Sequence, residues 1–327
     1  MRFGLTSEQR DFAGALDGLL TSADAVAAHR AWAAGDHDSG LGVWKRLAEL
    51  GVTALTVPEE SGGFGSTPTD LVVAFERLGH HGVPGPLIES IALAPALLAG
   101  TAAANLLSGL AEGSVRASFA AAPAAPYALD ADIATDVFVL DDDSLSRGTV
   151  GASLESVDPG RHLFRIAATD AVGTIDTATR ERALDLASLA CAADLVGAGE
   201  RILAETVTYL GRRRQFGRPI GEYQALKHVA ADTRVGLDFA RPLLLGAAAE
   251  LEHDSPGARR AVSAAKVAAT QAALLSARSG LQLHGAIGYT LECDLSVWLL
   301  RVRALAGCWG TPSAHRARVL ASLVEGR

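Results

Sequence analysis

Cysteine is scarce in this chain of 327 residues. The three that occur, Cys191, Cys293 and Cys308, have neither CxxC spacing nor a His/Cys pattern that would ligate a metal. We therefore expect free thiols in a reducing compartment, and we predict no metal site. Aromatic residues are also few, at 5% of the chain, whereas alanine is abundant. This composition favours close-packed helices over sheets.

An excess of positive charge is also missing. The formal net charge is -8, which argues against a general nucleic-acid-binding protein, because phosphate neutralisation needs a basic face. Glu8 and Arg10 lie where a signal peptide would have its apolar core. Residues 90–111 are uncharged, yet Pro95 and Gly100 interrupt them, so buried helices with a break are expected there and not a membrane span. A cytoplasmic protein without a membrane segment is predicted.

The residue pattern along the chain changes twice, from helical to β-prone and back to helical. Residues 1–113 have helical periodicity and predict an N-terminal α-helical domain. Residues 114–176 contain short β-prone pieces separated by Asp, Gly and Pro, which predict a small, reduced β domain. Long apolar-periodic segments fill residues 177–327, and four antiparallel helices of this length form a bundle. The predicted fold is mostly α, with a C-terminal four-helix bundle.

Local signals mark several helix ends. Thr6 or Ser7 can cap the first helix, Gly51 can end a later one, and Thr67 or Thr69 can open the next.

The most informative stretch is Arg-Arg-Arg-Gln-Phe-Gly-Arg-Pro-Ile at residues 212–220. An arginine guanidinium matches phosphate oxygens, and Phe216 could lie against a flat ring system. Taken alone, the arginines fit equally well a solvated helix end that complements the helix dipole. The context, with Gln215 before Phe216 and Tyr223 shortly after it, favours a ligand site.

This stretch resembles the flavin-contacting segment of acyl-CoA dehydrogenases. In that family an Arg-x-x-Phe-Gly run leaves one subunit and reaches the FAD pyrophosphate of its neighbour. A second run, residues 282–292, is similar to the Gln-x-x-Gly-Gly-x-Gly-Tyr loop, in which the Gln and a glycine meet the same FAD. The resemblance implies that Arg213, Gln215, Phe216, Tyr223, Gln282 and Gly285 bind FAD. His284 stands where the family usually has a glycine, and a structural role is expected for it.

A third run, residues 57–65, resembles the Pro-Glu-Glu-Tyr-Gly-Gly loop of the family's N-terminal domain. Three glycines and a proline within it predict a loop, and we assign it no chemistry.

The catalytic base of the family is missing. Oxidation of an acyl-CoA needs a carboxylate to remove the α-proton. Family members carry it in a Tyr-Glu-Gly-Thr run, and the matching residues here are Cys-Trp-Gly-Thr, which puts Trp309 at the position of the base. The family's other location, about 26 residues before Arg213, holds Ala187. Asp185 is two residues away, about 200° around a helix, so no catalytic residue is assigned.

The middle region also lacks the family's own flavin loop, Thr-Glu-Pro-x-x-Gly-Ser-Asp, and its Lys-x-Trp-Ile-Thr-Asn strand. The resemblance therefore implies a non-catalytic subunit of a heteromeric, α2β2 acyl-CoA dehydrogenase. Its catalytic partner would be a homologue, its substrate a bulky CoA thioester such as a steroid side-chain ester, and its acceptor an electron-transfer flavoprotein. Two alternatives stay open. One is a self-sufficient homomeric enzyme with Asp185 or Glu292 as a displaced base, and the other is a non-enzymatic scaffold or acyl-CoA-binding protein.

Overall fold

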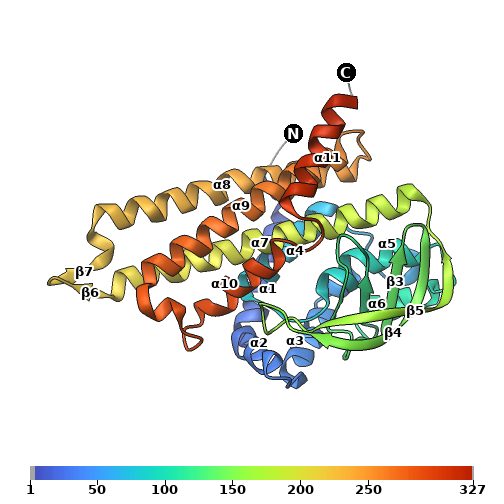
Figure 1. The fold of residues 1–327 in the computed structure, drawn as a ribbon, viewed down its shortest axis with the longest axis horizontal. Helices are drawn as coiled ribbons and strands as arrows, with labels where there is room; N and C mark the ends of the chain where they lie inside the picture. Colours follow the sequence, from blue (N-terminus) through green and yellow to red (C-terminus); the bar gives the residue numbers. More distant parts are fainter. Residues whose placement is uncertain (1–3, 326–327) are drawn as a thin grey trace.

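The computed structural model describes residues 4–325 and is mostly helical, as predicted (Figure 1). Residues 1–3 of the predicted N-terminal domain and residues 326–327 of the predicted bundle lie outside the described residues. Four helices form the first part of the chain: α1 (Ser7–Ser22), α2 (Ala25–Ala33), α3 (Asp38–Glu49) and α4 (Pro68–His81).

The expected caps are present at the ends of these helices. Thr6 caps α1 in a capping box with Gln9, and Thr67 caps α4 in the same way with Asp70, so two exposed amides are satisfied at each start. Gly51 follows α3 with φ 85°, the left-handed conformation that ends helices. Residues 57–65 form the expected loop around one short turn, Glu59–Ser61.

The uncharged stretch, with the two residues before it, forms a broken series of short helices: η3 (Ile88–Leu93), α5 (Ala94–Leu98), η4 (Ala104–Leu106) and α6 (Leu107–Ala111). The first is a π-helix and every one of its residues is buried. Within residues 4–325, no helix combines the length and the apolar character needed to cross a membrane.

The middle of the chain forms one small mixed sheet. Its strands are β1 (Ala117–Ala120), β2 (Ala128–Leu129), β3 (Asp136–Asp141), β4 (Ser144–Leu154) and β5 (Leu163–Thr174), in the order β1-β3-β4-β5-β2. Only the β1–β3 pair is parallel. The long β4–β5 hairpin is largely exposed, so this sheet has little core of its own and depends on the helices beside it.

The last part of the chain is the helical bundle, formed by α7 (Thr177–Arg212), α8 (Gln224–Glu252), α9 (Ala258–His284), α10 (Leu295–Leu305) and α11 (Pro312–Glu325). Helices α7 and α9 lie side by side and run in the same direction, and α8 packs on the other side of α9 in the opposite direction (Figure 1). The C-terminal ends of α7 and α9 therefore lie at the same end of the bundle.

Helix α7 also packs against α4, and two glycines allow this contact. A Cβ at Gly197 would lie 1.9 Å from the carbonyl oxygen of Glu76, and one at Gly79 would lie 2.2 Å from that of Asp194. The two helix backbones touch at these points, which is possible only without side chains.

A buried ion pair fixes α10 to the same core. The Arg301 guanidinium donates from Nε and Nη2 to the two carboxylate oxygens of Asp194, at 2.9 and 2.6 Å, and from Nη1 to the carbonyl of Val83 at 3.0 Å. One side chain thus joins α10, α7 and the segment after α4.

Candidate cofactor site

The predicted arginine-rich segment is a hairpin that projects from the end of the bundle. Helix α7 ends at Arg212, and the chain continues into the two short strands β6 (Arg214–Gln215) and β7 (Arg218–Pro219). The two turn residues, Phe216 and Gly217, both have positive φ, 51° and 82°. Two residues with positive φ are typical of tight hairpin turns, although a phenylalanine is unusual there.

The side chains of this hairpin face solvent. Phe216 is 92% exposed, and Arg213 and Gln215 are exposed as well. Within residues 4–324, Arg213 has no acidic partner. A free guanidinium beside an exposed aromatic ring is suited to a ligand that carries both a phosphate and a flat ring.

Tyr223 has a different position from the other predicted residues. It is half-buried directly before α8, and the Arg218 guanidinium lies over its ring at 4.0 Å from the centroid. This cation–π contact closes the base of the hairpin.

The second predicted segment lies at the same end of the bundle. Gln282 is exposed in the last turn of α9, and Gly285 begins the short helix η6 (Gly285–Tyr289). Gly285 has φ 64°, and a Cβ built there would meet no atom within 4 Å, so its backbone is open to close approach. The structure thus brings all six predicted residues to one end of the bundle.

A stacked aromatic pair connects the two segments. The rings of Tyr209 on α7 and His284 on α9 have centroids 4.4 Å apart and planes inclined by 19°. His284 is buried, and its Nδ1 lies 2.8 Å from the carbonyl oxygen of Gly280. The imidazole therefore points back into the helix ends, which agrees with the structural role expected for it.

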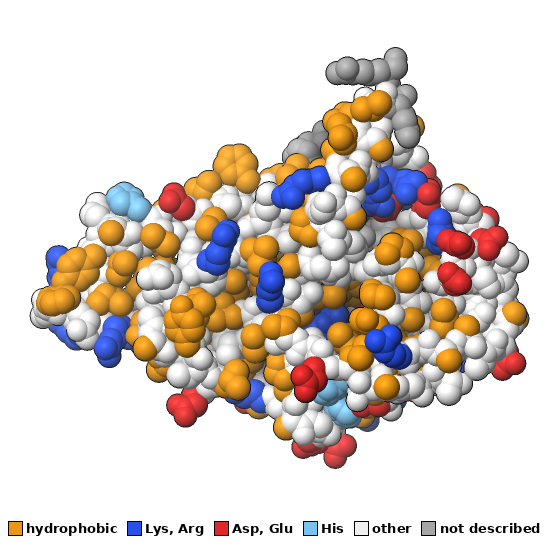
Figure 2. Space-filling view, in the orientation of Figure 1, with side chains coloured by type: hydrophobic (Ala, Val, Ile, Leu, Met, Phe, Trp, Pro, Cys, Tyr) orange, Lys and Arg blue, Asp and Glu red, His pale blue; other side chains and the backbone are white. Residues whose placement is uncertain are grey.

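The hollow beside this pair is small. Its volume is about 230 Å³, and its lining includes Glu205, Arg212 and Ile287. Basic and hydrophobic side chains gather on the outside of this end of the molecule (Figure 2). The six residues therefore fit one side of a dinucleotide site, and a second surface is needed to enclose the ligand.

A buried tryptophan occupies the position where the family carries its catalytic base. Trp309, between α10 and α11, is 2% exposed, and its carbonyl oxygen accepts hydrogen bonds from Ser188 Oγ and His315 Nε2, each at 3.0 Å. The neighbouring Cys308 sulfur lies 3.5 Å from Arg161 Nη2. An indole fills this position, and it cannot accept a proton from a substrate.

The two displaced candidates for the base have contrasting environments. Asp185 is buried, with Arg318 Nη2 2.6 Å from one carboxylate oxygen and Arg259 Nε 3.7 Å from the other. Burial raises the pKa of this carboxyl, and the two arginines oppose the rise. Glu292 is exposed on the loop after η6. Asp185 is thus committed to holding α7, α9 and α11 together.

One group escaped the sequence analysis entirely. Glu89 lies in the π-helix, fully buried, and its Oε2 has no hydrogen-bond partner within residues 4–324. Burial raises its pKa to about 7, although the nearby Arg161 acts in the opposite direction. Glu89 owes its environment to a π-turn, and sequence periodicity does not reveal such turns. The sequence therefore contains no signal for this residue.

Comparisons with known proteins identify the two helical parts of the chain. Residues 6–114 match the family described as acyl-CoA dehydrogenase, N-terminal domain, and residues 177–324 match acyl-CoA dehydrogenase, C-terminal domain. The acyl-CoA dehydrogenase IpdE2 of Mycobacterium tuberculosis is 34% identical over 290 residues, which cover 88% of each chain.

Solved structures share the fold over nearly the whole chain. A variant of the Tcur3481-Tcur3483 steroid ACAD is 22% identical with a TM-score of 0.85, covering 98% of both chains. The ChsE4-ChsE5 complex of Mycobacterium tuberculosis is 22% identical with a TM-score of 0.84, covering 99% of both. The FAD complex of PigA is 18% identical with a TM-score of 0.82, covering 100% of both.

The PigA neighbour is described as a complex with FAD, and the exposed guanidinium, aromatic ring and open glycine backbone described above suit such a ligand. The matched domains and the relative that aligns along most of its length show that this chain belongs to the acyl-CoA dehydrogenase family.

Proposed function

We propose that this chain is the non-catalytic subunit of a heteromeric FAD-dependent acyl-CoA dehydrogenase. It contributes Arg213, Gln215, Phe216, Tyr223, Gln282 and Gly285 to an FAD that a catalytic homologue holds. FAD, when bound, supplies the hydride acceptor for α,β-dehydrogenation of a CoA thioester. The residues of this chain bind and orient the cofactor, and the proton-abstracting carboxylate belongs to the partner.

The position of the hairpin carries this proposal. Strands β6 and β7 lie at one end of the molecule and the sheet lies at the other (Figure 1). A cofactor held against the chain's own sheet is therefore out of reach of Arg213 and Phe216. These residues also point into solvent, so a site that uses them is completed by another chain.

A second exposed surface supports assembly with a partner. Val235, Phe239 and Leu243 recur every four residues along α8 and are exposed, Phe239 by 72%. Phe239 and Leu243, together with residues of α9, line an apolar hollow of about 580 Å³. Such a stripe on one helix face is typical of a protein–protein contact. The stripe lies on the helix that follows the hairpin, which favours the same partner for both.

The finer features of the proposal rest on the comparisons. The similar Tcur3481-Tcur3483 structure is described as a steroid ACAD and the ChsE4-ChsE5 structure as a complex, which supports an α2β2 assembly acting on a steroid CoA ester. We further propose an electron-transfer flavoprotein as the acceptor for the reduced flavin, and a cytoplasmic location.

The test is co-expression with a catalytic homologue, followed by a count of flavin per chain. The expected result is half an FAD per chain in the complex and none in this chain alone. Arg213→Ala is expected to lower FAD affinity about 10- to 100-fold, the effect of losing a charge-assisted phosphate contact. Arg260→Ala is the matched control, because Arg260 is exposed at the opposite end of α9.

The same experiment separates the alternatives. A self-sufficient enzyme would be yellow and active when purified alone, and either Asp185→Asn or Glu292→Gln would abolish its flavin reduction. A scaffold or acyl-CoA-binding protein would form a complex whose FAD content does not change in Arg213→Ala.

A further inference from the structure

A separate cluster of possible metal ligands lies between the N-terminal helices and the sheet. His37 directly precedes α3, Asp132 lies in the turn between β2 and β3, and His162 directly precedes β5. One ligand atom from each lies within 4.8 Å of the other two. We propose that His37, Asp132 and His162 bind a divalent transition-metal ion, with Zn²⁺ as its representative.

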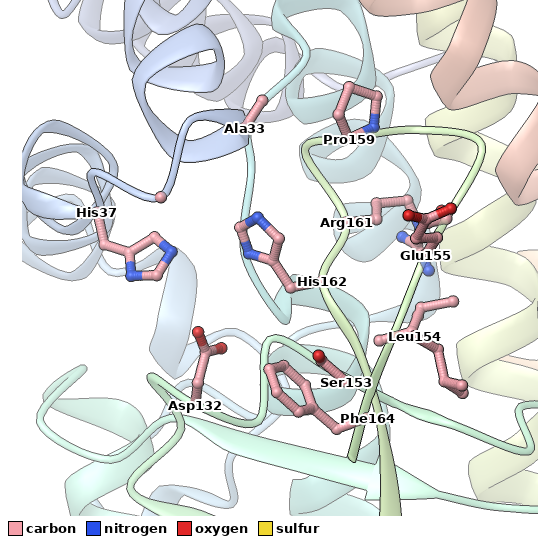
Figure 3. Close-up of a pocket in the computed structure, with 13 residues that line it drawn as sticks. Ala33, His37, Asp132, Ser153, Leu154, Glu155, Pro159, Arg161, His162 and Phe164 are labelled. Carbon is pink, nitrogen blue, oxygen red and sulfur yellow. The ribbon is translucent and has the colours of Figure 1, made fainter.

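The cluster faces an open cavity. His37, Asp132 and His162 lie on one side of a hollow of about 800 Å³, and Glu155, Arg161 and Phe164 are among its other lining residues (Figure 3). Tetrahedral Zn²⁺ with bonds of about 2.1 Å places its ligand atoms roughly 3.4 Å apart. Small rotations of the three side chains therefore suffice to bring the ligand atoms to this spacing. A tetrahedral ion would then keep one coordination position free, toward the cavity.

The environment of His162 is that of a metal ligand. Its Nδ1 lies 3.2 Å from Oδ1 of Asp130, a fully buried carboxylate. The same oxygen accepts from Trp32 Nε1 and from the His162 backbone amide, each at 3.2 Å. A carboxylate close to one ring nitrogen can orient the ring and leave Nε2 for a metal, as outer-shell carboxylates do for metal-binding histidines.

His37 has an equally specific environment. Its ring lies beside Trp32, with centroids 4.5 Å apart, and beside His162, with centroids 5.4 Å apart. Its Nε2 is buried and has no hydrogen-bond partner within residues 4–324. An unpaired buried nitrogen is unfavourable, and coordination to a metal would satisfy it.

The donor set selects the class of metal. Two imidazole nitrogens and one carboxylate suit Zn²⁺, Fe²⁺, Co²⁺, Ni²⁺ and Cu²⁺, whereas Mg²⁺ and Ca²⁺ prefer oxygen ligands. The ion would join the α2–α3 connection to two segments of the sheet.

The sequence predicts no metal site because these ligands are 95 and 30 residues apart and match no spacing motif.

Titration of the full-length chain with ZnCl₂, followed by calorimetry, tests the site, and the absorption spectrum with Co²⁺ reports nitrogen and oxygen ligation. We expect one ion per chain. His37→Ala, His162→Ala and Asp132→Ala should each weaken binding at least tenfold. Asp132 is exposed, so its variant tests the site without disturbing the core. No flavin is present in this measurement, so its result does not depend on the proposed function.

Two matched variants control for adventitious sites. His253 is exposed between α8 and α9, and Cys293 is a free thiol far from the cluster in sequence. His253→Ala and Cys293→Ser should leave the affinity for Zn²⁺ unchanged. Binding that survives all three ligand substitutions, that disappears in either control, or that needs millimolar Zn²⁺ overturns the proposal.

Discussion

Tyr209 stacks on His284 at a centroid distance of 4.4 Å, and this contact holds the C-terminal ends of α7 and α9 side by side. The hairpin continues from one helix and the Gly285 loop from the other. The spacing between the two candidate FAD-binding segments therefore depends on two rings that are not among the six predicted cofactor residues.

Removing this stack should weaken the proposed cofactor site. Aromatic pairs contribute about 0.5–1.5 kcal/mol beyond their burial, so Tyr209→Ala should lower FAD affinity of the heteromeric complex by up to about tenfold. Tyr209→Phe keeps the stacked ring and should leave affinity unchanged. Fluorescence titration of the apo-complex with FAD measures both. Equal affinities for the two variants would show that the stack does not position the site.

The close approach of α4 and α7 makes Gly197 sensitive to substitution. A methyl group there would meet the Glu76 carbonyl at 1.9 Å, so Gly197→Ala should destabilise the protein by about 1–3 kcal/mol or more. Gly211, near the end of the same helix, has no atom within 4 Å of an added Cβ. Gly211→Ala should stabilise the helix by up to about 1 kcal/mol. Urea unfolding measures both, and a loss of stability in the two variants alike would contradict the backbone contact.

The buried pair of Arg301 and Asp194 should respond asymmetrically to mutation. Arg301→Leu leaves a buried carboxylate without its partner and should cost about 3–5 kcal/mol. Replacing both residues with leucine should recover part of that loss, because no unpaired charge remains.

The exposed pair of Arg30 and Asp294, at 2.8 Å, is the control. Arg30→Leu should cost less than about 1 kcal/mol. Thermal denaturation of the three variants measures these effects, and equal losses in Arg301→Leu and Arg30→Leu would contradict the assignment.

Glu89 should make stability depend on pH. Its pKa is about 7 in the folded chain against an ordinary value of 4.5, so the folded state binds more protons between these values. The free energy of unfolding should therefore fall as pH rises through this range, by roughly 3 kcal/mol from this group, and stay level above it. Glu89→Gln should remove the contribution of this residue to the decrease in the free energy of unfolding. Chemical denaturation of both proteins at pH 5 and pH 8 measures the difference, and parallel profiles would show that Glu89 does not titrate in this range.

Several features were predictable because their cause is local. The caps at Thr6 and Thr67 and the stop at Gly51 follow from side-chain and backbone preferences of a few adjacent residues. The long helices follow from apolar periodicity, and Trp309 was recognisable as a departure from a motif.

Other features depend on distant parts of the chain, and sequence spacing does not reveal them. The π-helix around Glu89 is stabilised by the core that surrounds it. The stack of Tyr209 on His284 requires two parallel helices in one register. His37, Asp132 and His162 approach one another only after the sheet packs beside α2 and α3. The positive φ of Phe216 is likewise a property of the hairpin and not of phenylalanine.

The exposed turn at Phe216 has a consequence for the amount of this protein in a cell. Strands of two residues are marginal when nothing covers them, and arginines flank this turn on both sides. In the proposed assembly a partner shields the turn, whereas surplus copies leave the bonds after Arg213 and Arg214 open to trypsin-like proteases. Degradation of the surplus would then adjust the supply of this chain to the supply of its partner.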